Sequence, residues 1–157
     1  MLDALGHTST VTDSDWATAT AVLRVSAQLV DDISAGLAER GYPDVRPVHG
    51  FVFAELSDNA STAADLATAL QITKQAAAQL IVYLVERGYL DKHPDPNDRR
   101  AQLVTLTQRG HECMVAARES AERCVQVWRD ELPDRDFKAL TRALDVIAVP
   151  GRLKPSW

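Results

Sequence analysis

The most chemically distinctive segment of this 157-residue chain is a short polar run, Asp95-Pro96-Asn97-Asp98-Arg99-Arg100. It places two adjacent guanidinium groups on a loop that Pro94 and Pro96 stiffen. Arginine side chains enter the narrow, strongly negative minor groove of duplex DNA, where they sense groove width and A·T content. The run therefore predicts a minor-groove contact. The alternative is a solvated turn with a surface ion pair worth about 0–1 kcal/mol.

A second group of polar residues precedes this loop, at the start of a predicted helix. Thr73, Lys74 and Gln75 would occupy its first turn, and Gln79 would lie one turn further on. Lysine suits a phosphate or a guanine, and glutamine can pair with N6 and N7 of adenine. Residues 76–78 are alanines, which offer only close packing or contact with thymine methyl groups. We expect modest reading of bases in the major groove, unless this is the polar first turn of an ordinary helix.

Two helices joined by a tight turn would position these side chains. Ser61 is predicted to cap a short helix over residues 61–70, and residues 71–72 to form the turn. Thr73 is predicted to cap the following helix, which Gly88 would end. This spacing is typical of a helix-turn-helix, although such helix pairs also occur in proteins that never touch DNA.

The period of the sequence changes after Gly88. Residues 89–93 and 101–106 are predicted to be strands on either side of the proline-containing loop, which makes a β-hairpin tipped by Arg99 and Arg100. A helix in one groove and an arginine-tipped wing in the next would form a coherent DNA-binding surface.

Long amphipathic helices are predicted on both sides of this centre. One spans residues 13–40, and a shorter helix begins at Pro47. Thr107 would open another long helix to about residue 132, and Asp134 would cap a last one. The fold class is therefore mainly α with a small β-hairpin wing. The apolar faces of the long helices could form a dimer interface or close the monomer's own core.

Composition permits this interpretation. The net charge of −5 opposes nucleic-acid binding when taken alone. However, residues 61–110 carry six Lys or Arg and five Asp or Glu, a net charge of +1, so the acidic excess lies in the flanks. No run approaches the roughly 18 apolar residues of a membrane span, and no secretory signal is visible. We therefore expect a cytoplasmic protein that does not associate with membranes.

The sequence contains no motif that predicts an enzyme, a metal site or a cofactor. The four histidines are scattered and lie at no metal-ligand spacing. Cys113 and Cys124 would lie about 16 Å apart along one helix, too far for a disulfide. We interpret both as packing residues, and the sequence leaves open whether either has a redox role.

The run from Asp95 to Gly110, DPNDRRAQLVTLTQRG, resembles the wing of the MarR family of bacterial regulators, D-x-x-D-x-R-A-x-x-V-x-L-T-x-x-G. The preceding segment, from Leu80 to Leu90, is similar to the end of that family's recognition helix. The resemblance implies that Arg100 enters the minor groove and that Asp98 holds it through a carboxylate–guanidinium pair. Arg99, at a more variable position, would contact phosphate.

The resemblance also implies the organisation of the chain and its partners. We expect one domain over residues 1–157, with a winged helix-turn-helix DNA-binding lobe at 47–106 and N- and C-terminal dimerisation helices at 13–40 and 107–149. A small aromatic or phenolic effector would bind in a crevice beside the dimer helices, and the residues near that region along the chain are Trp16, Arg46, His49, Phe51 and Phe53.

The predicted function is that of a homodimeric, sequence-specific transcriptional regulator of double-stranded DNA. It would be a ligand-responsive repressor that binds a pseudo-palindromic operator. The alternative is a protein-interaction module that uses the winged fold without binding DNA. The operator, the regulated genes and the effector do not follow from the sequence.

Overall fold

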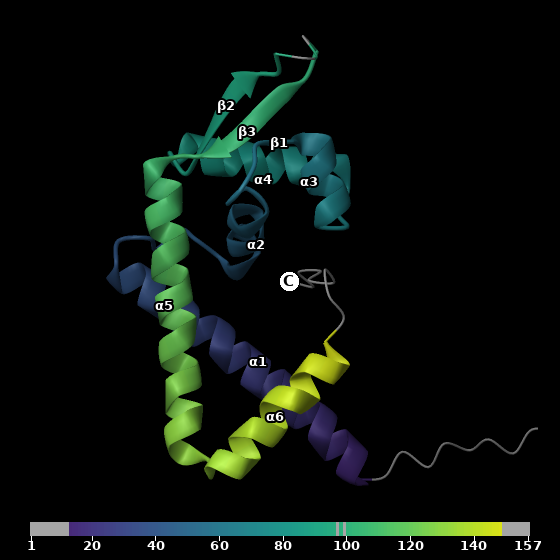
Figure 1. Ribbon diagram of the computed structural model, residues 1–157, viewed down its shortest axis with the longest axis vertical. Coiled ribbons are helices and arrows are strands. Elements are labelled where there is room, and N and C mark those ends of the chain that lie inside the picture. Colours follow the sequence, from purple (N-terminus) through teal and green to yellow (C-terminus); the bar gives the residue numbers. More distant parts are fainter. Residues whose placement is uncertain (1–12, 97, 99, 149–157) are drawn as a thin grey trace, which may run out of the picture.

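A computed structural model describes residues 13–96, 98 and 100–148, which form six helices and one small sheet (Figure 1). The elements are α1 (Asp13–Glu39), α2 (Pro47–Glu55), β1 (Ser61–Thr62), α3 (Ala63–Ala69), α4 (Lys74–Glu86), β2 (Leu90–Pro94), β3 (Gln102–Leu106), α5 (Gln108–Glu131) and α6 (Asp134–Ile147). This order confirms the predicted mainly α class with a hairpin wing.

The sheet has a third strand that the sequence did not predict. Strand β1 pairs antiparallel with β3, in the order β1-β3-β2, and places Ser61 opposite Val104. Ser61 is therefore a strand residue, and the prediction that it caps the next helix is wrong. Thr62 caps α3 instead, because its hydroxyl accepts a hydrogen bond from the Asp65 amide at 3.2 Å. A strand of two residues is too short to show the alternation of apolar and polar residues from which a strand is predicted.

The other predicted helix starts are confirmed, with one exception. Pro47 begins α2, and the hydroxyls of Thr73 and Thr107 cap α4 and α5. The last helix is capped by Pro133, whereas Asp134 is its first helical residue and pairs with Lys138 at 2.7 Å. An aspartate in the first turn stabilises the positive end of the helix without being the cap itself.

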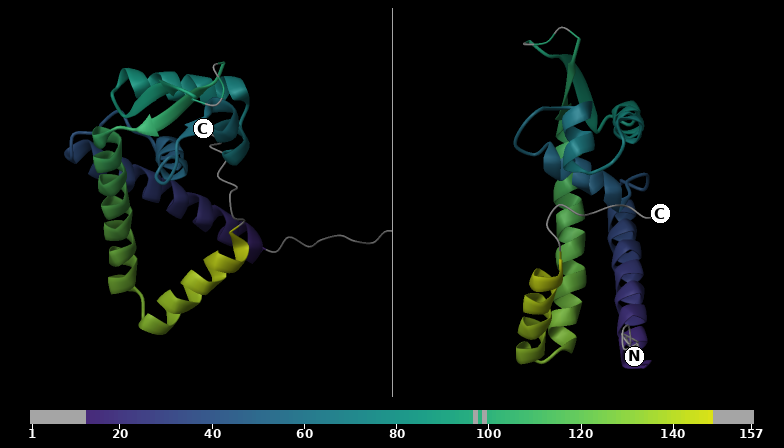
Figure 2. Two further views of the ribbon diagram at one scale, coloured as in Figure 1. Left: turned by 45° about the horizontal axis from the view of Figure 1, so that its top comes forward. Right: turned by 90° about the vertical axis from the view of Figure 1, so that its right-hand side faces the viewer.

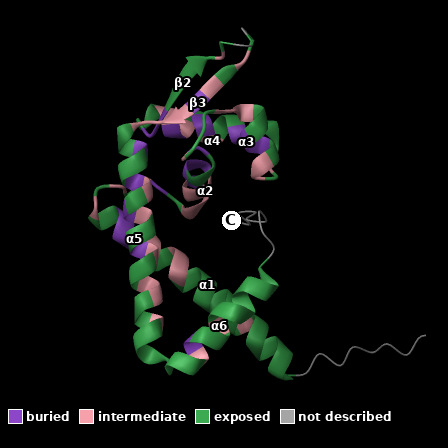
Figure 3. Ribbon diagram, in the orientation of Figure 1, coloured by how far each residue is buried: buried purple, intermediate pink, exposed green. Residues whose placement is uncertain are grey.

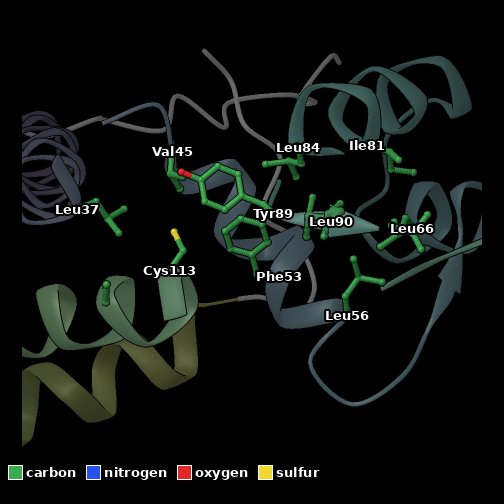
Figure 4. Close-up of a cluster of buried hydrophobic side chains, with 13 residues drawn as sticks. Leu37, Val45, Phe53, Leu56, Leu66, Ile81, Leu84, Tyr89, Leu90 and Cys113 are labelled. Carbon is green, nitrogen blue, oxygen red and sulfur yellow. The ribbon is translucent and has the colours of Figure 1, made fainter. Parts of the chain in front are cut away.

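The core lies mainly within the winged lobe, where α2, α3, α4, β2 and β3 contribute to it (Figure 4). Its fully buried side chains include Phe53 of α2, Leu66 of α3, Leu84 of α4 and Val104 of β3. Leu37 of α1 and Cys113 of α5 extend the core to the long helices. Burial raises the pKa of the Cys113 thiol to about 12, so this cysteine is a packing residue, as predicted.

Helices α1, α5 and α6 project away from the lobe, which Figure 2 shows from two sides. Helices α1 and α5 cross closely at Gly36, where an added Cβ would lie only 2.6 Å from the Ser120 hydroxyl. Arg40 fixes the same crossing by donating to Ser120 at 2.7 Å and pairing with Glu119 at 3.0 Å. No helix among the described residues is both long and apolar enough to cross a bilayer.

Candidate nucleic-acid interface

Helix α4 presents the predicted polar residues at its amino-terminal end. Ala77, Ile81 and Leu84 face the core at helical spacing and so fix the rotation of the helix. Lys74, Gln75 and Gln79 are consequently exposed. The Thr73 hydroxyl accepts a hydrogen bond from the Ala76 amide at 3.1 Å, so it caps the helix while it stays at the surface. The structure therefore brings all four residues to one exposed end.

The turn before α4 sets the angle between the two helices of the motif. Gln71 adopts a left-handed conformation with φ of 52°, and the Ile72 amide donates to the Ala67 carbonyl at 3.0 Å. A non-glycine residue in this region marks a tightly determined turn. The helix-turn-helix predicted from residues 61–88 is thus present, with α3 and α4 as its two helices.

The wing is the β2–β3 hairpin, which is in register from Leu90 opposite Leu106 to Pro94 opposite Gln102. Two backbone hydrogen bonds close its tip: the Asp95 amide donates to Ala101 at 3.1 Å and the Ala101 amide to Asp98 at 2.9 Å. Arg100 lies exposed in this tip. Arg99, the predicted phosphate contact, falls outside the described residues.

Asp98 holds the wing tip in a different way from the one predicted. Its carboxylate accepts a hydrogen bond from the backbone amide of Arg100 at 2.9 Å, a short-range contact over two residues. The sequence predicted a pair with the guanidinium instead. An Asp side chain readily bonds an amide two residues on, because this closes a turn locally. Asp98 thus shapes the loop and leaves the Arg100 side chain at the surface.

A hollow of about 570 Å³ lies between the amino-terminal end of α3, α4 and the wing. Its walls include Ala78 and Val82 of α4, Lys92 of β2, Arg100 of the wing tip and Gln102 of β3. The structure therefore places the Arg100 side of the wing and the exposed side of α4 around one depression.

The base of the wing is locked to the start of α5. The Thr107 hydroxyl donates to the Gly88 carbonyl at 2.7 Å and accepts from the Gly110 amide at 3.0 Å. A Cβ on Gly110 would collide with the carbonyl oxygen of Tyr89 and would lie 2.8 Å from a Leu106 methyl carbon. This contact explains why a glycine must stand three residues after the threonine in the wing motif.

Asp44 links the α1–α2 loop to the recognition helix. Its carboxylate accepts a hydrogen bond from the Tyr89 hydroxyl at 2.7 Å and pairs with Arg87 at 3.2 Å. Its backbone carbonyl accepts from the Tyr83 hydroxyl at 2.7 Å. Sequence reasoning missed this residue, because its partners lie 39 to 45 positions away and no local pattern connects them.

Arg109 of α5 joins the same cluster from the other side. Its guanidinium lies 4.8 Å from the centre of the Tyr89 ring and 5.3 Å from that of Tyr42, and it donates to the Tyr89 hydroxyl at 3.2 Å. Burial and the hydrogen bond to Asp44 raise the pKa of Tyr89 to about 12. Tyr89 therefore remains a neutral donor to Asp44, and the cluster connects α4, the wing base and α5.

A groove of about 800 Å³ separates α2 from α4, and we call it the α2–α4 groove. It is lined by Val30, Ser34, Arg46, Pro47, Val48, His49, Phe51, Leu70, Ile72, Ala76, Gln79, Leu80 and Tyr83. Most of these side chains are apolar, and the groove reaches from α1 to the exposed part of the recognition helix. Its volume lies within the range of roughly 300–1,000 Å³ that is typical of small-molecule pockets.

Three of the five residues predicted to bind an effector lie along this groove: Arg46, His49 and Phe51. Phe53 does not, because it is fully buried in the core. Residues two positions apart in a helix point in directions that differ by about 200°, so Phe51 and Phe53 face opposite sides of α2. Trp16 is 71% exposed and lies about 20 Å along α1 from Val30, outside the groove.

His49 is a neutral histidine in the wall of the groove. Its Nδ1 accepts a hydrogen bond from the Arg46 amide at 3.1 Å, which leaves the proton on Nε2. Its ring packs on Tyr83 with the ring centres 4.9 Å apart. Burial, and to a smaller extent the Arg46 charge, lowers the pKa of His49 to about 4.

This pKa predicts an acid-sensitive fold. The unfolded chain binds a proton at His49 near pH 6.5, whereas the folded chain does so only near pH 4. Stability therefore falls as the pH drops through this window, and this group should account for about 3 kcal/mol of the loss. The free energy of unfolding can be measured with urea between pH 7 and pH 4. In His49→Gln it should fall by about 3 kcal/mol less over this range than in the wild type. His93 is exposed, so His93→Gln should lose as much stability on acidification as the wild type. If the wild type and both variants show the same dependence of stability on pH, His49 is not the group responsible.

Comparison with known proteins shows what this chain is similar to. A sequence model of the MarR family matches residues 44–101. The HTH-type transcriptional regulator BilQ of Clostridioides difficile (strain CD3) is 26% identical over 83 residues, which are 53% of this chain and 56% of BilQ. The match thus spans little more than half the length of this curated relative.

Solved structures share the fold over most of both chains. AbsC, a MarR family transcriptional regulator from Streptomyces coelicolor, superposes with a TM-score of 0.66 at 23% identity and covers 87% of this chain and 93% of its own. FabT of Streptococcus pneumoniae, solved in complex with DNA, superposes with a TM-score of 0.73 at 13% identity, with coverages of 84% and 93%. The chain therefore shares the winged helix-turn-helix fold of these structures, and its central segment, residues 44–101, matches the sequence model of the MarR family.

Proposed function

We propose that this protein binds duplex DNA sequence-specifically and regulates transcription. The observation that carries the proposal is the common face of α4 and the wing. Lys74, Gln75 and Gln79 are exposed on α4, and Arg100 borders the hollow beside that helix. A recognition helix in the major groove and an arginine wing in the adjacent minor groove would use this face without rearrangement. FabT, which shares the fold, has been solved in complex with DNA, and this supports DNA binding by the same fold here.

Enrichment of random duplexes at two salt concentrations tests this function. The expected product is a pseudo-palindrome whose half-sites lie about ten base pairs apart. Its affinity should fall as salt rises, because cations on this face displace counterions from phosphates. No enrichment at low salt would contradict DNA binding and would favour a protein-interaction module.

We further propose that the functional unit is a homodimer formed through α1, α5 and α6. Residues 13–28 of α1 are exposed apart from the half-buried Thr20, and Phe137 is the one buried residue of α6 (Figure 3). Large apolar side chains lie uncovered on these helices, among them Trp16, Leu23, Leu144 and Ile147. Helices of this kind obtain most of their stability from packing. We therefore infer that a second copy of the chain packs against these exposed apolar side chains.

The variant Leu23→Glu should therefore be monomeric. Leu23 is 70% exposed within one chain, so the change costs the isolated fold little, whereas it would bury a charge in the interface. Analytical ultracentrifugation should give a dimer for the wild type and mainly monomer for the variant. Arg24→Glu, an exposed neighbour on the same helix, provides the charge control. A dimeric Leu23→Glu protein would contradict this interface.

The finer proposal is that the protein is a repressor released by a small aromatic or phenolic effector in the α2–α4 groove. The groove contacts α1 and α2 on one side and Ala76, Gln79 and Tyr83 of the recognition helix on the other. A molecule bound there could favour one separation of the two recognition helices, provided that its affinity differs between two states. His49 and Arg46 supply polar groups for such a ligand.

A further inference from the structure

The exposed face of α4 carries an apolar residue that neither the core nor the predicted site explains. Ala77, Ile81 and Leu84 form the buried row of this helix, at spacings of four and three residues. Gln75, Gln79 and Val82 form a second row with the same spacing, displaced by two residues. A displacement of two residues rotates the side-chain direction by about 200° around the helix axis, so the second row points almost directly away from the core.

Val82 lies in the open part of this row. It is 46% exposed and forms part of the hollow between α4 and the wing. Ala78 and Ile81 are the other residues of α4 that line the same hollow, so no polar side chain of this helix lines it. The row from Gln75 to Val82 spans about 10 Å along the helix, which corresponds to about three base-pair steps.

The two glutamines and the valine of this row are side chains that suit contacts with A·T pairs. A glutamine amide pairs with N6 and N7 of adenine, whereas the one apolar feature of the major groove is the C5-methyl group of thymine. We propose that Val82 reads a thymine in each half-site by packing its methyl groups against that C5-methyl. This inference rests on the proposed DNA-binding function and identifies Val82 as a specificity-determining residue.

The test replaces single thymines of the enriched duplex with deoxyuridine, which removes only the C5-methyl group. Burial of one such group changes affinity about fourfold. The wild type should therefore lose about fourfold at one position in each half-site, and about fifteenfold when both are replaced. Val82→Ala should bind the thymine and deoxyuridine duplexes equally at that position. Alanine has the higher helix propensity, so α4 should remain folded, which circular dichroism can verify.

Gln75→Ala is the matched control on the same row. It should weaken binding overall but keep the fourfold response to deoxyuridine, because Val82 is intact. If no thymine position distinguishes the wild type from Val82→Ala, the inference is wrong although DNA binding stands. If the wild type enriches no duplex, the proposed function and this inference fail together.

Discussion

Arg100→Ala is expected to lower the affinity for the enriched duplex by at least about 100-fold. Each hydrogen bond to a charged group contributes roughly 1.5–3 kcal/mol, and a dimer would lose one wing arginine in each half-site. The fold should be unaffected, because Arg100 is exposed and the tip is closed by its backbone amide and by Asp98. Fluorescence anisotropy with labelled duplex measures the affinity, and thermal unfolding verifies the fold.

Arg135→Ala provides the matched control for this prediction. Arg135 lies on α6, its side chain is 90% exposed, and it pairs with the adjacent Asp136 at 3.0 Å. The substitution removes the same charge from a helix outside the lobe, so the affinity should change little. If Arg100→Ala binds as tightly as the wild type, the wing does not contact DNA.

Gly110→Ala is expected to destabilise the fold by roughly 2–3 kcal/mol. The added methyl group would overlap the Tyr89 carbonyl, which is backbone and already accepts a hydrogen bond from the Thr107 amide. Overpacking of this kind forces backbone shifts that commonly cost 1–3 kcal/mol. Because this contact joins the wing base to α5, the loss of stability should be accompanied by weaker DNA binding. Urea unfolding monitored by circular dichroism gives the free energy of unfolding.

Gly50→Ala is the control, and it should raise the free energy of unfolding rather than lower it. Gly50 lies inside α2, and a Cβ there would have no neighbouring atom within 4 Å. Alanine in such a helix position typically stabilises by about 0.5–1 kcal/mol. Equal stabilities for Gly110→Ala and the wild type would show that α5 can move away from Tyr89, contrary to the packing described above.

The features predicted correctly from sequence are those with a local signature. Thr73 and Thr107 as caps, Pro47 as a helix start and β3 as a strand are all predicted from residues within a few positions. The helix-turn-helix and the wing follow from these local features, as does the exposure of Lys74 and Gln75.

The features that were missed depend on distant contacts. Strand β1 exists because Ser61 and Thr62 meet β3 some 40 residues later, and Asp44 acquires its role from Tyr83, Arg87 and Tyr89. Proximity along the chain also placed Phe53 in the effector site, whereas the helical turn of α2 directs it into the core. Tertiary packing determines the first two features, which periodicity in one sequence does not encode, whereas the direction of Phe53 follows from helical periodicity within α2.

Footprinting of the enriched duplex tests the central claim most directly. Hydroxyl radicals report the minor groove, and dimethyl sulfate reports N7 of guanine in the major groove. We predict two-fold related minor-groove protections that flank two major-groove protections about ten base pairs apart, with Arg100→Ala losing the minor-groove protections first. Protection of a single half-site, or a minor-groove pattern that Arg100→Ala leaves intact, would contradict a dimer that reads DNA with α4 and the wing.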